Sequence, residues 1–106
     1  MTFTASLTQQ GRTAVITMEG ALDDSAAPIF HDRIEHASAA DLDRLVLEMS
    51  KLESISSAGL RGLTFCRQKM GGDVRIVLVS PSDEVRRSIE KVDLEQSVSF
   101  ADRLPE

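Results

Sequence analysis

Two apolar runs separated by a helical segment constrain the fold of this chain more than any other feature. The runs RLVLEM (residues 44–49) and VRIVLV (74–79) are nearly continuous in apolar residues, a pattern typical of strands covered on both faces. Between them, residues 57–70 place apolar side chains at helical spacing, and Gly71-Gly72 ends that segment. A strand, a helix and a strand within about 35 residues form a βαβ unit, so we expect the two strands to be parallel.

The remaining segments add elements on both sides of this unit. Alternating apolar and polar residues over 3–8 and 13–20 predict an edge hairpin. A first helix over 25–38, capped by Asp24 or Ser25, is expected before the run at 44–49, and residues 50–55 form a short connection after that run. A third helix follows the cap residue Ser82, SVSF (97–100) is a short last strand, and the final residues fray. The predicted order is ββαβαβα(β): an α/β fold with a small mixed sheet of four or five strands and three or four helices packed against it.

Length and composition limit the functions that the chain can have. Its 106 residues suffice for a single domain, 1–106, with one core. No apolar run approaches a membrane span, no signal-peptide pattern opens the chain, and the single cysteine permits no internal disulfide, so we expect a cytoplasmic protein without membrane insertion. A net charge of −5 and the absence of Trp and Tyr argue against nucleic-acid binding.

Candidate functional residues gather where the second helix is predicted to begin. Ser56 and Ser57 are followed by Ala58 and Gly59. A helix N-terminus presents free N–H groups and can host an anion, and glycine leaves the backbone open to close approach. Serines before helices are usually caps, each worth about 1 kcal/mol. From spacing alone, capping is the favoured explanation of both serines, and a functional site is the alternative.

The second helix is predicted to have one apolar and one polar face. The apolar stripe should face the sheet and consists of Leu60, Leu63, Cys66 and Met70. The opposite face holds Arg61, Gln68 and Lys69. Phe65 also falls on this polar face, where an aromatic side chain indicates a docking surface.

Two segments of this chain resemble the STAS domain, the family of bacterial anti-sigma factor antagonists. In LVLEMSKLESISSAGLRGLTF (45–65), residues 55–60 match the family pattern Ile-(Asp/Ser)-Ser-(Ser/Ala)-Gly-Leu position by position. In GALDDSAAPIF (20–30), Gly20, Leu22 and Asp23 are in register with the family's first-helix entry, Gly-x-Leu-Asp. Gly62 departs from the family, which has an apolar residue at this position. It should weaken the helix by up to about 1 kcal/mol relative to alanine. It should also either thin the packing or admit a close partner. The resemblance extends along nearly the whole chain and implies a STAS-like single domain.

This resemblance implies a phosphorylation-controlled partner switch. The serine before the small residue and glycine, here Ser57, would be phosphorylated by an anti-sigma factor that is also a serine kinase of the GHKL ATPase type; Ser56 is the alternative site. The unphosphorylated form would bind that partner and release the sigma factor, and a PP2C-type phosphatase would reset the switch. The implied partner surface comprises Asp23, Ser56, Ser57, Ala58, Gly59, Leu60, Arg61 and Phe65.

Other functions are weighed against this one. The same fold could serve as a subunit of a stress-sensing or secretion-regulating assembly, or as the soluble subunit of a lipid or anion transport complex. An enzyme is not expected, because no nucleophile–base pair can be placed. No metal or other cofactor is expected either, since His31 and His36 are spaced wrongly for one helix face and Cys66 lies on the core stripe. We expect a monomer or a weak homodimer.

Overall fold

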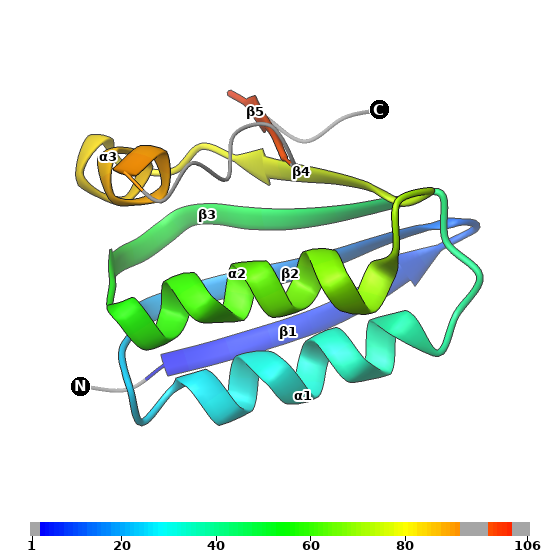
Figure 1. The fold of residues 1–106 in the computed structure, drawn as a ribbon, viewed down its shortest axis with the longest axis horizontal. Helices are drawn as coiled ribbons and strands as arrows, with labels where there is room; N and C mark the ends of the chain where they lie inside the picture. Colours follow the sequence, from blue (N-terminus) through cyan, green and yellow to red (C-terminus); the bar gives the residue numbers. More distant parts are fainter. Residues whose placement is uncertain (1–2, 92–97, 103–106) are drawn as a thin grey trace.

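A mixed five-stranded sheet carries three helices among the residues that the computed structural model describes, 3–91 and 98–102 (Figure 1). The strands lie in chain order: β1 (Phe3–Gln10), β2 (Thr13–Leu22), β3 (Arg44–Ile55), β4 (Arg75–Val79) and β5 (Ser99–Ala101). β1 and β2 are antiparallel, and every later pair is parallel. The parallel strands are connected by α1 (Ala27–Ser38), α2 (Ser57–Met70) and α3 (Asp83–Lys91). The predicted element order and the parallel βαβ unit are confirmed.

The helices bury their apolar residues against one face of the sheet. α1 and α2 lie side by side over β1, β2 and β3 (Figure 1). Alternate residues of β2 and β3 join one buried cluster with Phe30 and Ile34 of α1, with Leu63 and Cys66 of α2, and with Val85 and Ile89 of α3. This shared face is expected when successive crossovers are right-handed and step in one direction across the sheet.

The opposite face of the sheet carries a second, smaller buried cluster. It consists of Val46 in β3 and Val77 and Val79 in β4, with Val15 and Ala101 packed against it. These central strands are therefore buried on both faces, which explains why they are nearly continuous apolar runs in the sequence.

The turn between β1 and β2 confirms the predicted hairpin. Gly11 adopts a φ of 62°, in the left-handed region that glycine tolerates best. The guanidinium of Arg12 lies 2.7 Å from an oxygen of Asp41 and 2.8 Å from one of Asp43. Hydrogen bonding to Arg12 lowers the pKa of Asp43. These ion pairs tie the hairpin to the loop that leads into β3.

β3 extends six residues beyond its prediction, because residues 50–55 are strand and not connection. Lys51, Leu52 and Ile55 pair with Glu19, Gly20 and Leu22 of β2. The pairing of β4 with β3 has already ended at Glu48. The end of β3 thus has a strand neighbour only on its β2 side, and its exposed polar residues hid the strand pattern.

The helix starts differ in how they are capped. α1 begins at Ala27, and neither Asp24 nor Ser25 caps it. Instead, the carboxylate of Asp23 accepts hydrogen bonds from the Ala26 N–H and the Ser25 hydroxyl, at 3.0 and 2.8 Å. The predicted cap of α3 is confirmed, since the Ser82 hydroxyl accepts from the Val85 N–H.

The C-terminal predictions are tested only in part. β5 confirms a short last strand, shifted to Ser99–Ala101. Ser97 lies outside the described residues. The segment 101–106 was expected to fray, but Ala101 belongs to β5, and residues 103–106 lie outside the described residues.

Candidate functional site

The corner where β3 meets α2 is held together by Ser56. Its backbone N–H donates to the Leu22 carbonyl at 2.9 Å, which fixes the corner to the end of β2. Its hydroxyl accepts from the Gly59 N–H and donates to a carboxylate oxygen of Asp24, each at 3.3 Å. The capping explanation is therefore right for Ser56, whose hydroxyl both donates and accepts within the chain.

Ser57 is in a different situation, although it follows directly. It is the first residue of α2 and is exposed. Among the described residues, its hydroxyl has no hydrogen-bond partner. With Leu60, Arg61 and Thr64 it lines a shallow pocket on the outer surface of α2. Ser57 thus presents an unengaged hydroxyl to the surroundings, whereas Ser56 does not.

Gly59 is needed for the packing of this corner. A Cβ atom at this position would lie 2.7 Å from Ile55 Cγ1, 2.8 Å from Leu22 Cγ and 2.9 Å from the Leu22 carbonyl oxygen. The missing side chain of Gly59 thus lets β2 of the same chain pack closely against the start of α2. Gly59 is buried, and Ala58 beside it is half-buried.

Phe65 does not lie on the outer face of α2, and that prediction is wrong. It is half-buried, packs against the main core and stacks on His31 of α1, with ring centroids 4.6 Å apart. Gly62 is buried and permits the close approach of α1, because a Cβ there would lie 2.8 Å from Phe30 Cδ2. The expected effect of Gly62 was thinner packing or the approach of a partner protein. In the structure, Gly62 instead lets α1 of the same chain pack closely.

The helix is rotated relative to its predicted stripe. Its buried residues are Gly59, Gly62, Leu63 and Cys66, whereas Leu60 is only half-buried. The two glycines carry no apolar side chain, so they could not mark the buried face in the sequence. Burial raises the pKa of the Cys66 thiol to about 12, which leaves it a poor nucleophile.

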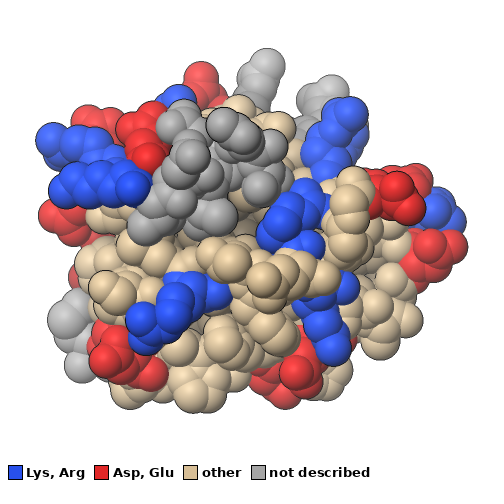
Figure 2. All heavy atoms as spheres, in the orientation of Figure 1, with Lys and Arg blue, Asp and Glu red and all other residues tan. Residues whose placement is uncertain are grey.

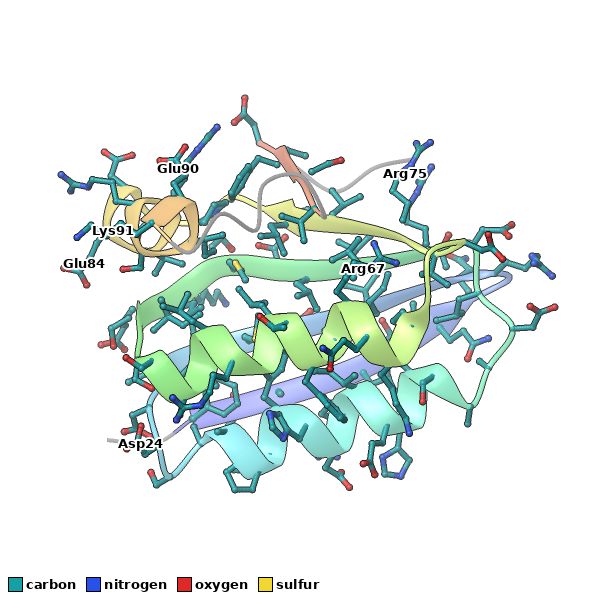
Figure 3. All side chains as sticks on the ribbon, viewed as in Figure 1. Asp24, Arg67, Arg75, Glu84, Glu90 and Lys91 are labelled. Atoms are coloured by element: carbon teal, nitrogen blue, oxygen red, sulfur yellow. The ribbon has the colours of Figure 1, made fainter. Side chains whose placement is uncertain are left out.

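Two adjacent acids lead into α1, and they have different roles. Asp23 turns its carboxylate into its own loop, and the hydrogen bond from the Ser25 hydroxyl is the main cause of its lowered pKa. Asp24 instead contacts the Ser56 hydroxyl, and Figure 3 shows Asp24 at the end of the molecule where α2 begins. Asp24 thus makes the side-chain hydrogen bond between this acidic turn and the β3–α2 corner.

The charges around the corner are unevenly distributed. α2 contains the cations Arg61, Arg67 and Lys69 and no Asp or Glu. Figure 2 shows the face formed by α1 and α2 as largely uncharged, with basic side chains across it and acidic side chains along its lower edge. Within residues 3–91 and 98–102, no three His, Cys, Asp or Glu side chains gather as a metal site would require, and no helix is long and apolar enough to cross a bilayer.

Comparison with known proteins agrees with this architecture. The family model described as the STAS domain matches residues 4–106. The anti-sigma-F factor antagonist RsfB of Mycobacterium tuberculosis is 26% identical over 94 residues, which span 89% of this chain and 77% of RsfB. An anti-sigma factor antagonist from Mycobacterium paratuberculosis superimposes with a TM-score of 0.88 at 23% identity, covering 97% of this chain and 88% of that one.

SpoIIAA has the same fold in two states. The anti-sigma factor antagonist SpoIIAA in its unphosphorylated form gives a TM-score of 0.79 over 92% of this chain and 88% of that one, at 20% identity. The Bacillus cell fate determinant SpoIIAA in its phosphorylated form gives 0.72 over 92% and 91%, also at 20% identity. Because the family model matches residues 4–106 and the fold is shared, the chain belongs to the STAS domain family.

Proposed function

We propose that this protein is an anti-sigma factor antagonist that is switched by phosphorylation of Ser57. The observation that carries the proposal is the contrast between two neighbouring hydroxyls: that of Ser56 is used as a helix cap, and that of Ser57 is exposed and unengaged. A kinase needs an accessible hydroxyl, so the geometry favours Ser57 over Ser56. The similarity to RsfB and the fold shared with the two forms of SpoIIAA support the same role.

The proposed partner is an anti-sigma factor that is also a serine kinase of the GHKL ATPase type. It would dock on residues 56–61, where Leu60 and Arg61 provide apolar and cationic surface, and on the neighbouring Asp23–Asp24 turn. Phe65 stays in this proposed surface with the part of its side chain that stacking on His31 leaves accessible. The released sigma factor would then be free to act.

Phosphorylation would end this contact by electrostatics and desolvation. A phosphate adds about −1.5 to −2 charges at pH 7, and an interface over Ser57 would have to remove that charge from water without a prepared partner. Because Ser57 is exposed at a helix start, the modified domain keeps its fold and only the interface is lost. A PP2C-type phosphatase would restore binding.

Two matched variants, Ser57→Ala and Ser56→Ala, test the proposal. The protein is isolated from its native cells and its phosphopeptides are mapped. We expect phosphate on Ser57 in the parent and in Ser56→Ala, and none in Ser57→Ala, which should still capture the ATPase partner. Phosphate on Ser56, or unchanged phosphorylation in Ser57→Ala, would move the site. No phosphate under any growth condition would contradict the switch and favour a constitutive docking or transport subunit.

A further inference from the structure

Ser57 and Arg61 are placed one above the other on the exposed surface of α2. They are four residues apart in one helix, the spacing at which side chains meet across a turn. Both are exposed and both line the pocket described above. Among the described residues, no acidic side chain pairs with Arg61, whereas Arg12, Arg33 and Arg86 each have such a partner. An unpaired cation therefore lies one turn from the proposed acceptor hydroxyl.

The surroundings of Ser57 would direct a phosphate toward this cation. Asp24 reaches the preceding residue, Ser56, and its negative charge would repel a phosphate on that side. An acidic group placed four residues before a cation is the favourable orientation on a helix, because it also suits the helix dipole. A guanidinium can donate two parallel hydrogen bonds to phosphate oxygens.

We propose that Arg61 is the counter-ion of phosphorylated Ser57 within the same chain, and that phosphorylation draws Arg61 away from the docking surface. This inference rests on the proposed function. The switch would then change two features of the corner at once. It adds a dianion beside Leu60, and it removes from the partner the cation that stands next to that apolar contact.

The test installs the phosphate without any kinase, by incorporating phosphoserine at position 57 during translation. The phosphate is then titrated by phosphorus NMR in the parent and in Arg61→Gln. A nearby cation favours the dianion, so the phosphate pKa should be lower in the parent. We expect Arg61→Gln to raise its protonation constant about 1.5- to 2-fold, and Arg61→Lys to keep part of the effect. The Arg61 Nε–H resonance of the parent should also shift on phosphorylation.

Lys69→Gln is the matched control, because it removes one exposed charge from the same helix three turns away. It should leave the phosphate titration unchanged, and unphosphorylated Arg61→Gln should melt like the parent. Identical titrations in the parent and Arg61→Gln would overturn the proposal. They would leave Ser57 intact as a phosphorylation site, since that question is decided separately by phosphopeptide mapping.

Discussion

Replacing Gly59 by alanine should destabilise the fold, although alanine is the better helix former. The new Cβ would meet Ile55 Cγ1, Leu22 Cγ and the Leu22 carbonyl oxygen, all at less than 3.0 Å. Leu22 is fully buried, and its carbonyl accepts the hydrogen bond from the Ser56 N–H, so it cannot move without loosening the corner. Overpacking of this kind costs about 1–3 kcal/mol, and three simultaneous contacts, one of them with backbone, place Gly59→Ala near the upper end.

The opposing gain is up to about 1 kcal/mol of helix propensity. The net loss is therefore about 2 kcal/mol, or a melting temperature lower by about 8–16 °C for a domain of this size. Because the chain has no Trp or Tyr, unfolding is followed by far-ultraviolet circular dichroism. Gly72→Ala is the control, since no atom of the other described residues, its chain neighbours aside, lies within 4 Å of a Cβ there, and it should be neutral or slightly stabilising. A Gly59→Ala protein as stable as the parent would refute the argument.

Three further measurements probe other parts of the structure. Ser56→Ala should lose about 1 kcal/mol in urea unfolding because the cap of α2 is removed, and equal stability would contradict the capping role. Cys66, whose pKa burial raises to about 12, should react with a disulfide reagent only at the rate of unfolding, and fast reaction of the folded protein would disprove its burial. Arg12 lowers the pKa of Asp43 in the folded protein. The pair therefore stabilises the fold fully at pH values above the ordinary aspartate pKa of about 3.9, and this stabilisation is lost as the pH falls through the pKa that Asp43 has in the folded protein. Arg12→Gln should therefore make the loss of stability below about pH 4 shallower, and an unchanged pH profile would exclude that contribution.

The sequence predicted the fold well where burial and pattern coincide. β4 is covered on both faces, and its nearly continuous apolar run predicted this buried strand. The last six residues of β3 were missed because that segment has a strand neighbour on one side only and keeps exposed polar side chains. The rotation of α2 was missed for the opposite reason: Gly59 and Gly62 lie on its buried face, and glycine has no side chain to reveal it.

The sequence motif located the candidate site, but the different roles of Ser56 and Ser57 could be assigned only from the coordinates. Nothing in the pair Ser56-Ser57 says which hydroxyl is used as a cap, since both residues are serines and both positions are compatible with capping. The three-dimensional contacts assign that role to Ser56 through Gly59 and Asp24. The involvement of Asp24 depends on a contact across 32 residues of sequence, which local patterns do not record.

The order of the strands in the sheet also affects how the protein is made. Each strand pairs with the one synthesised just before it, so a nascent chain can extend the sheet in the order in which it leaves the ribosome. The β3–α2 corner, and the residues of β2 and of the turn before α1 that contact it, are synthesised before β4. β4 is complete at Val79, 24 residues after β3 ends at Ile55, which takes roughly 1–5 s at about 5–20 residues per second. During that interval the edge of β3 that will receive β4 has no strand beside it, which makes this edge the place where aggregation during translation is expected to begin.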